Sequence, residues 1–547
     1  MKPGFTASSL KDDLFGGATA AVVALPLALA FGVSSGAGAL AGLYGAIFAG
    51  FLAAIFGGTR VQITGPTGPM TVVMTLVITH FSGNLGAAFA VVVLAGIFQV
   101  LLGKLGIGRF IKLVPQPVVS GFMTGIGIII IVVQFGPILG QESPDGGVLE
   151  QLAQVPAMLS GDLNPIAVTL FACTLAVLIW IPSRLARLVP PPLFVLLAGT
   201  LIAILFTLSV PVIGPIPTGL PGLIAPGIDV AEIPYIVRFA LVLAFLGAID
   251  SLLTSIVADS MTRSAHDSDR ELLGQGIGNI AAGLFGGLPS AGATMRTLVN
   301  VRAGGRSRLS GAIHSIILAA ILLGFGGMVS LIPIPVLAAI LVKVGIDIID
   351  WQYLGRLRNL PRSELAVMLA TLLLTVLVDL ITAVAVGFVM ASVLFVARVA
   401  DSQIKGARFV FGADDIEDLS AEESELLARS DGRLVLFHVE GPLSFGSARD
   451  LARLIQSDIE KDVLAIDMRG VPFVDSSACS AIAEVIKRLH DDGDWVLLFG
   501  LRDPVRDMLH KSGVLDDLGE GRITGSRMEA IKLGLSIIED SDTSERE

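Results

Sequence analysis

The amino-acid sequence predicts an all-α polytopic membrane protein of fourteen spans, arranged as an inverted repeat of seven plus seven, followed by a small α/β domain. Three observations carry this prediction. The chain has 547 residues, 53% of them hydrophobic, and its mean hydropathy of +0.80 lies well above that of soluble proteins. Apolar runs of spanning length repeat up to residue 400, and positively charged loops recur between them. Beyond that point the composition changes to that of a soluble domain.

The apolar runs are rich in Leu, Ile, Val and Ala, and most can cross a hydrocarbon core of roughly 30 Å as helices. We expect spans near residues 16–33, 38–57, 66–79, 87–103, 117–139, 164–181, 191–210, 236–257, 272–286, 293–301, 309–329, 333–349, 364–379 and 382–400. The third and tenth runs are the two short ones. We interpret the first as a retained helix because another span follows it directly; the alternative is a cleaved signal peptide.

Loop charges predict the orientation of the spans, because Lys and Arg gather on the cytoplasmic side of a membrane. With a cytoplasmic N-terminus, the loops that follow even-numbered spans must carry them. They do, with Arg60, Lys104, Arg109, Lys112, Arg184, Arg187, Arg263, Arg270, Arg302, Arg306, Arg308, Arg356, Arg358 and Arg362. The opposite loops at 141–165 and 211–234 carry none, and only Arg238 departs from the pattern. Both termini are therefore predicted to be cytoplasmic, and an odd number of spans per half inverts the second half.

The predicted domains follow the change in composition. We expect a transmembrane domain over 1–400, an acidic linker over 401–432, an α/β domain over 433–540 and a disordered tail over 541–547. Within the α/β domain, strand patterns at 433–440, 462–468 and 495–499 alternate with amphipathic helix patterns at 448–460 and 476–489.

The sequence lacks the motifs of several functional classes. The two cysteines, Cys173 and Cys479, form neither a disulfide framework nor a metal-binding pattern. The sequence has no GxxxxGK[ST] loop for an ATP-driven pump and no nucleophile–base arrangement for an enzyme, so we expect no catalysis, no cofactor and no nucleic-acid partner. The net charge of −11 comes largely from the tail and says little about a substrate. We interpret the glycines at 274, 276 and 278 as close helix packing rather than dinucleotide binding.

Two polar stretches interrupt the third and tenth spans, at matching positions of the two halves. Residues 62–71 and 288–297 are clusters of Gly, Pro and hydroxyl residues within apolar sequence. Backbone that leaves the helix at membrane depth is tolerated only where it is buried in protein or lines a cavity, so the pair predicts a substrate site. Each stretch leads into a half-helix, starting at Pro66 and at 291–293. The alternative is that Pro and Thr merely start and cap two ordinary spans.

Two helix N-termini that point at one cavity make an anion site, because each carries about half a positive charge and unpaired N–H groups. The hydroxyls of Thr67, Thr71, Thr294 and Thr297 add donors. Arg296 lies inside the tenth run, where a charge needs a partner or an aqueous cavity. We interpret it as a charge for the bound anion; the alternative is an ion pair with Asp250.

Asp250 is the only ionisable residue between 241 and 254, and it shares a helix face with Thr254. A carboxylate beside a hydroxyl and freed carbonyl oxygens suits Na⁺, and a carboxylate alone could carry a proton. Both interpretations compete with pairing to Arg296. In the tail, capping of a helix by Asp475 or Ser476 is the simpler interpretation, but a phosphoryl group on Ser477 would also suit that helix end.

Over nearly its whole length the chain resembles the SulP family of anion transporters, the bacterial relatives of the animal sulfate-permease carriers. The motifs that carry the resemblance lie at 13–17, 24–28, 62–71, 274–279, 292–300 and 304–311, and the tail resembles a STAS domain at 466–468 and 473–477. The resemblance implies UraA/SulP-like core and gate domains, elevator-like movement of the core, and a homodimer. Nucleobase transporters are similar in plan but lack a STAS tail.

Within the family the chain looks closest to the BicA-type bicarbonate transporters, through 250–254, 257–260, 344–351 and part of 65–70. That resemblance implies a Na⁺ site of Asp250, Thr254, Gly292 and Thr294. It implies a bicarbonate site with Thr67, Gly68 and Ala293, and with Phe31 as an aromatic neighbour. Arg296 departs from this branch, which has a small residue there, whereas many sulfate, dicarboxylate and halide members have Arg. A fixed cation close to Asp250 could replace Na⁺ electrostatically.

The sequence therefore predicts a secondary active transporter of inorganic anions in the bacterial inner membrane, with Na⁺-coupled bicarbonate uptake as the first expectation. The alternative within this class is a sulfate or C4-dicarboxylate transporter that is coupled to H⁺ or works as an exchanger. An anion channel or a STAS-linked sensor is the alternative from another class. A cytoplasmic regulator at the STAS domain is a further expected partner.

Overall fold

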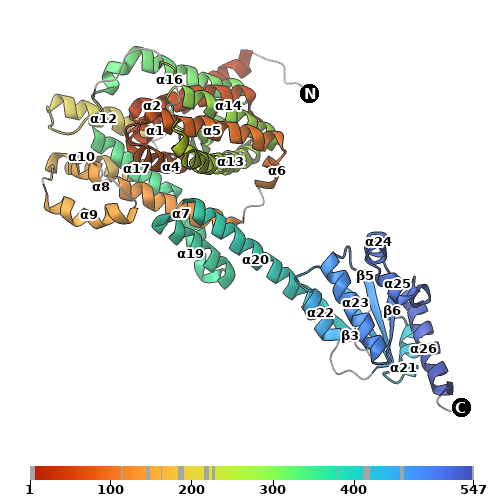
Figure 1. Cartoon of the computed structure of the whole chain (residues 1–547). Coiled ribbons are helices and arrows are strands. Elements are labelled where there is room, and N and C mark those ends of the chain that lie inside the picture. Colours follow the sequence, from red (N-terminus) through yellow and green to blue (C-terminus); the bar gives the residue numbers. More distant parts are fainter. Residues whose placement is uncertain are drawn as a thin grey trace. The chain divides into compact units, whose positions relative to one another are not determined.

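The chain forms two compact units, Met1–Ala391 and Ser392–Glu547, which are described separately (Figure 1). The structure is a computed structural model. The structure describes residues 7–111, 115–142, 148–161, 163–182, 190–214, 221–224, 228–378, 380–410, 419–455 and 461–544.

The first unit is helical, as predicted. Its helices are α1 (Ala7–Ser34), α2 (Ala39–Tyr44), the π-helical turn η1 (Gly45–Ala49), α3 (Gly50–Phe56), α4 (Gly68–His80), α5 (Leu85–Lys104), α6 (Gly108–Ile111), α7 (Gln116–Val133), α8 (Phe135–Leu139), α9 (Val148–Ser160), α10 (Pro165–Trp180), α12 (Pro191–Leu205), α13 (Ile233–Thr262), α14 (Ser268–Leu284), α15 (Thr294–Arg302), α16 (Arg308–Val329), α17 (Ile334–Ile348), α18 (Trp351–Leu354), α19 (Arg362–Leu377) and α20 (Leu380–Gly406). Each predicted apolar run coincides with one of these helices or with consecutive ones. Among the described residues, six helical stretches are long and apolar enough to span a membrane and four more apolar helices are shorter. The count of fourteen spans stays a prediction.

The helices of this unit pack in two groups. One group contains α1–α5 and α13–α16, and the other contains α7, α8, α10, α12, α17 and α19. Helices α5 and α14 lie closely together because glycines face each other: a Cβ on Gly96 would come within 2.6 Å of the carbonyl oxygen of Gly276. The glycines predicted to serve helix packing do so, since Gly274 abuts Gly57 and Gly278 abuts Ala49.

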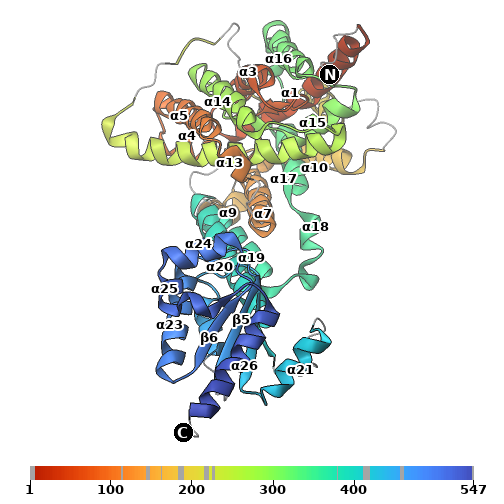
Figure 2. The same cartoon turned by 90° about the vertical axis from the view of Figure 1, so that its right-hand side faces the viewer.

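The two interrupted spans meet as the inverted repeat requires. Strands β1 (Thr64–Gly65) and β2 (Ala291–Gly292) precede α4 and α15, and they pair antiparallel, Thr64 with Gly292 and Gly65 with Ala291. An antiparallel pairing of two equivalent segments is what inverted halves produce. Helix α13, the long yellow-green helix in Figure 2, passes across the bundle and contacts α4, α14 and α15.

Helix α9 was not predicted from the sequence, which indicated only a loop at 141–165. Its apolar residues alternate with polar ones and it contains Pro156, so no apolar run of spanning length marks it. Several of its leucines are exposed, including Leu149 and Leu159. Exposed leucines on a short amphipathic helix are typical of a position at a membrane surface.

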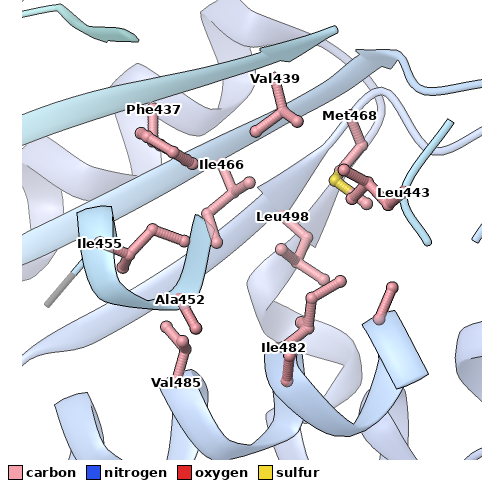
Figure 3. Close-up of a pocket in the computed structure, with 12 residues that line it drawn as sticks. Phe437, Val439, Leu443, Ala452, Ile455, Ile466, Met468, Ile482, Val485 and Leu498 are labelled. Carbon is pink, nitrogen blue, oxygen red and sulfur yellow. The ribbon is translucent and has the colours of Figure 1, made fainter. Parts of the chain in front are cut away.

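The second unit is an α/β domain with a five-stranded sheet in the order β3–β4–β5–β6–β7. The strands are β3 (Arg408–Val410), β4 (Leu434–Glu440), β5 (Val463–Gly470), β6 (Trp495–Phe499) and β7 (Ile523–Thr524); β3 is antiparallel and the others are parallel. The helices are α21 (Ala421–Arg429), α22 (Ala448–Ile455), α23 (Ser476–Asp491), α24 (Asp503–Lys511), α25 (Val514–Leu518) and α26 (Arg527–Ser544). Figure 3 shows the apolar face of the sheet, where Ile466 and Leu498 point towards Ile482 and Val485 of α23.

The predicted boundaries of this domain differ from the structure. The stretch 401–432, predicted to be a linker, contains the end of α20, strand β3 and helix α21; residues 411–418 of it lie outside the described residues. Strand β3 extends the sheet, and Leu427 of α21 is fully buried against it. A capping box of Ser420 and Glu423 starts α21, so its acidic residues belong to a folded helix. Helix α26 likewise continues through Ser544, into the stretch predicted to be a disordered tail.

Candidate anion-binding site

The N-termini of α4 and α15 lie side by side because β1 and β2 pair directly before them. Helix α4 starts at Gly68, two residues after the predicted Pro66, with Thr67 as its N-cap; Ala293 is the N-cap of α15. Neither N-cap side chain accepts a hydrogen bond from its helix. The N–H groups that these first turns possess, none at Pro69, are therefore not capped by these side chains, and two positive helix ends favour an anion.

The four predicted threonine hydroxyls are not equivalent. Thr71 donates to the carbonyl oxygen of Thr67 at 2.8 Å, and the Thr297 hydroxyl accepts from the backbone N–H of Ile63 at 3.0 Å. These two hydroxyls hold the backbone of residues 63–67, the elbow that leads into α4. The Thr67 hydroxyl, by contrast, is buried and makes no hydrogen bond of standard geometry with a described residue, although it lies close enough to the Asp250 carboxylate to interact with it. Thr67 is therefore the better candidate for a ligand contact.

Arg296 is almost fully buried, with 2% of its surface exposed. Its Nη2 donates to the carbonyl oxygen of Pro66 at 2.5 Å, while its Nη1 has no hydrogen-bond partner among the described residues. Gly65 leaves the space for this guanidinium, since a Cβ there would collide with Nη1. Arg296 thus carries an uncommitted donor next to the elbow that begins α4.

The ion pair of Arg296 with Asp250 that the sequence left open as an alternative is absent: within the described residues, no contact of 4.0 Å or less joins their charged atoms. Asp250 nevertheless lies close enough to Arg296 to interact with its charge. One oxygen of Asp250, Oδ2, is buried and has no hydrogen-bond partner in the part of the chain that the structure describes.

The other three residues of the predicted Na⁺ site form one cluster. The Thr254 hydroxyl donates to the carbonyl oxygen of Gly292 at 2.9 Å and lies 2.7 Å from the hydroxyl oxygen of Thr294. Asp250 lies one turn before Thr254 on α13. Carboxylate, carbonyl and hydroxyl oxygens are the ligands that hard cations prefer, so these residues fit a Na⁺ ion. Within the described residues, no three His, Cys, Asp or Glu side chains converge as a transition-metal site would require.

Apolar side chains surround the start of α4. A Cβ on Gly68 would lie 2.6 Å from Ile130 Cδ1 of α7, 2.8 Å from Ile348 Cδ1 of α17 and 4.0 Å from Phe31 Cε1 of α1. Phe31 thus lies beside the first half-helix, and its place beside the substrate stays a prediction. Sequence reasoning missed Ile130 and Ile348, because nothing distinguishes them from the other apolar residues of their spans.

A cavity of about 940 Å³ lies between the two helix groups. Its polar lining includes Ser34 at the end of α1, Thr75 and Thr79 on the C-terminal half of α4, and Gln134 between α7 and α8. Gln134 Nε2 donates to Ser34 Oγ at 3.2 Å and so links the two groups. The lining belongs to the helix ends that the loop charges predict to face away from the cytoplasm.

Ser477 lies apart from this site, in the second unit. It is exposed in the first turn of α23. The helix is capped by Asp475, whose carboxylate accepts from the backbone N–H groups of Ala478 and Phe445, each at 2.8 Å. Capping by Asp475 is thereby confirmed, and modification of Ser477 stays a prediction.

Comparison with known proteins matches two family models to the chain. The model of the Sulfate permease family matches residues 10–371, and that of the STAS domain matches residues 425–530. The first match covers both half-helices and the second covers most of the sheet of the second unit.

The chain is 43% identical over 536 residues to the bicarbonate transporter BicA of Picosynechococcus. The aligned region covers 96% of this chain and 94% of that protein. It is 32% identical over 534 residues to the putative sulfate transporter YvdB of Bacillus subtilis, over 94% of this chain and 96% of the relative. Among solved structures, the transmembrane domain of a cyanobacterium bicarbonate transporter BicA superimposes with a TM-score of 0.65 at 48% identity, covering 69% of this chain and 98% of its own. Murine Solute Carrier 26 family member A9 shares the fold, with a TM-score of 0.85 at 19% identity over 98% of this chain and 93% of its own.

Proposed function

The chain belongs to the sulfate permease family, and from this premise we propose that it is a secondary active transporter that takes up bicarbonate together with Na⁺. The observation that carries the proposal is the pairing of β1 with β2, which brings two uncapped helix N-termini together at one place. An anion can be held there by backbone N–H groups without being locked to a side-chain charge.

Bicarbonate fits the donors at this place. The first-turn N–H groups of both helices receive no bond from the N-cap side chains, and the Thr67 hydroxyl and Nη1 of Arg296 make no hydrogen bond of standard geometry with a described residue. Identity of 43% to a bicarbonate transporter over nearly the whole chain favours bicarbonate over sulfate, for which the named relative is 32% identical.

Na⁺ is the proposed coupling ion, carried as a second substrate. Asp250, Thr254, Gly292 and Thr294 would hold it, because the oxygen atoms of the last three lie together, Asp250 lies one turn before Thr254, and Oδ2 of Asp250 makes no hydrogen bond of standard geometry with a described residue. Arg296 donates to the Pro66 carbonyl through one nitrogen and makes no contact of 4.0 Å or less with the carboxylate, although their charges interact. A cation beside the anion would offset the charge of the anion during transfer.

Movement would follow an elevator-like scheme. The group of α1–α5 and α13–α16 is the proposed core that carries both half-helices, and the group around α7 and α17 is the proposed gate. Ile130 and Ile348 of the gate face Gly68 and would seal the site, while the cavity at Ser34 and Gln134 would give access from outside. We further propose a multi-pass protein of the bacterial inner membrane with both termini cytoplasmic, working as a homodimer without covalent chemistry.

The experiment that tests the proposal is uptake of labelled bicarbonate into proteoliposomes that contain the purified chain. An inward Na⁺ gradient should drive saturable uptake, and replacing Na⁺ with K⁺ should abolish it. Uptake driven equally well by either cation would overturn the sodium coupling. A flux that never saturates with bicarbonate would instead indicate a channel.

Arg296 favours a second candidate function, transport of sulfate or a C4-dicarboxylate with H⁺ or by exchange. A fixed buried cation with a free donor suits a more highly charged anion. Labelled sulfate and succinate, measured in the same proteoliposomes, decide between the candidates. Uptake of either one at a higher kcat/KM than bicarbonate would make it the substrate.

A further inference from the structure

A buried carboxylate outside the proposed site is held mainly by N–H groups, with Arg308 near enough to interact with its charge. Glu271, in the first turn of α14, is only 1% exposed. Its Oε2 accepts from the backbone N–H groups of Gly58 at 2.9 Å and Thr59 at 2.8 Å. Its Oε1 accepts from the side-chain amides of Gln62 and Gln275, both at 2.8 Å. Four N–H donors thus converge on one buried carboxylate, a satisfied arrangement that is costly to disturb.

Each of these glutamines also makes a hydrogen bond to a residue that lies closer to the proposed transport site. Gln275 Nε2 also donates to the Thr64 hydroxyl of β1 at 2.7 Å. Gln62 Oε1 accepts from the Ser255 hydroxyl of α13 at 2.9 Å, and the Gln62 side chain packs against Gly292 of β2. Thr64 lies three residues before Thr67, and Ser255 directly follows Thr254. The carboxylate is therefore joined, through one side chain each, to the anion elbow and to the helix that bears the proposed Na⁺ residues.

We infer that Glu271 is a positioning residue that fixes the relative placement of the anion elbow on β1–α4 and the Na⁺ residues on α13. The inference rests on the proposed function for the identity of the two ions. Glu271 touches neither ion and acts through Gln62 and Gln275.

The chemistry explains why a carboxylate is needed. An ionised carboxyl group has only acceptors, whereas the amide of Gln has one acceptor oxygen and two donor hydrogens. In Glu271→Gln, either the backbone donors of Gly58 and Thr59 or the side-chain donors of Gln62 and Gln275 would face an NH₂ group. If Gln62 rotates its amide to compensate, it turns an NH₂ group towards the Ser255 hydroxyl in place of the acceptor. The link to α13 is then altered while the volume of the side chain is kept.

The test measures transport kinetics of Glu271→Gln in proteoliposomes. We expect the KM for bicarbonate and the half-saturating Na⁺ concentration each to rise about tenfold, a loss that corresponds to one buried hydrogen bond of this kind. The maximal rate per folded molecule should fall much less. A merely structural role would lower the folded fraction and the melting temperature but leave both concentrations unchanged, and that result would overturn the inference.

The double variant Glu271→Gln with Gln62→Glu exchanges the two side chains, so that the amide lies at position 271 and the carboxylate at position 62. Ser255 can then donate to the carboxylate at position 62, and the oxygen of the amide at position 271 can accept from Gly58 and Thr59. Its NH₂ group can donate to that carboxylate and, once Gln275 rotates its amide, to the Oε1 of Gln275, which has no hydrogen-bond partner among the described residues. We expect both concentrations to return to within about threefold of wild type. Additive losses in the double variant would contradict the network.

Asp13→Asn is the matched control. Asp13 is also a buried carboxylate of the first unit, and it accepts from the backbone N–H groups of Arg306 at 2.7 Å and Ser307 at 2.9 Å. Its partners lie in the turn before α16, so this variant should lower stability without changing either concentration. If wild type proves to carry another anion, the same constants are measured for that anion. Failure of the bicarbonate proposal is thus separate from failure of the inference about Glu271.

Discussion

Arg296 on α15 donates a hydrogen bond from Nη2 to the carbonyl oxygen of Pro66 at 2.5 Å, directly before α4. The second half-helix therefore holds the elbow that begins the first. Pro66 and Gly65 suit this contact, because Pro breaks the helix and so frees a carbonyl, and Gly leaves room for the guanidinium. The remaining donor, Nη1, is buried without a partner among the described residues. The Arg296 side chain thus makes one structural hydrogen bond through Nη2 and keeps a second donor nitrogen, Nη1, for a ligand.

Replacing Arg296 with Gly should weaken anion binding. The variant removes a buried positive charge and leaves the Pro66 carbonyl without its donor, and a hydrogen bond to a charged group is worth about 1.5 to 3 kcal/mol. We expect the KM for bicarbonate to rise at least about tenfold, measured as initial uptake rates in proteoliposomes. Arg296→Lys should recover little, because an ammonium group cannot present two nitrogens in a fixed fork.

The same Arg296→Gly variant tests whether the arginine replaces sodium. If Arg296 only supports the anion, wild type and variant both require Na⁺. Wild-type uptake that ignores Na⁺, together with a variant that requires it, would identify Arg296 as the built-in substitute and contradict the coupling proposed above. An unchanged KM would show that the guanidinium serves the elbow alone.

Replacing Asp250 with Asn should abolish the dependence of uptake on Na⁺. The amide keeps the size of the side chain but removes the charge of the carboxylate one turn before Thr254. We expect the half-saturating Na⁺ concentration to rise at least about tenfold, or uptake to vanish, in a titration at fixed bicarbonate. Asp347→Asn is the control, since Asp347 is an exposed carboxylate paired with Lys343 at 2.5 Å. A normal Na⁺ titration in Asp250→Asn would remove Asp250 from the site.

Adding a methyl group at Gly68 should slow transport. A Cβ there meets Ile130 and Ile348 at 2.6 and 2.8 Å, so the proposed gate must shift or the core must move against a larger barrier. Overpacking of this kind costs about 1 to 3 kcal/mol. We expect Gly68→Ala to lower the maximal uptake rate at saturating bicarbonate, and Ile130→Val to restore part of it. The matched control is Gly324→Ala, because a Cβ at Gly324 meets nothing within 4 Å.

Much of this site could be predicted because broken helices leave a strong signal in apolar sequence. Gly, Pro and Thr clusters at 62–71 and 288–297 predicted the two half-helices, and the loop charges predicted that they lie in inverted halves. Pairing of Thr64 with Gly292 follows directly from that arrangement. The elbow is thus encoded locally, in residues that cannot continue a helix.

Other features could not be predicted because they depend on tertiary packing. Ile130 and Ile348 resemble every other apolar residue of their spans, and only the fold brings them to Gly68. The sequence suggested a bound anion or the carboxylate of Asp250 as the partner of Arg296, and the backbone carbonyl was missed. The carbonyl of Pro66 was the less obvious choice, because a freed backbone group has no sequence signature of its own.

The buried ion pair of the second unit should control its stability at low pH. Glu423 accepts from Arg527 Nη2 at 2.8 Å and Nε at 3.0 Å, and both side chains are about nine-tenths buried. The Arg527 guanidinium lowers the pKa of the Glu423 carboxyl from 4.5 to about 2. Because the folded pKa lies below the unfolded one, the stabilisation is complete above pH 4.5 and disappears as the pH falls from about 4.5 through about 2.

Glu423→Gln should therefore lower the free energy of unfolding of this unit by about 3 kcal/mol at pH 7, because it removes the carboxylate charge that pairs with the buried Arg527 guanidinium. The difference from wild type should shrink as the pH is lowered through that window. Urea unfolding can be followed by the fluorescence of Trp495, against which Arg522 packs, after Trp180 and Trp351 are replaced with Phe. The control is Glu422→Gln, whose exposed pair with Lys532 should contribute about 0 to 1 kcal/mol. Equal effects of the two substitutions at pH 7 would mean that the buried pair does not stabilise the domain.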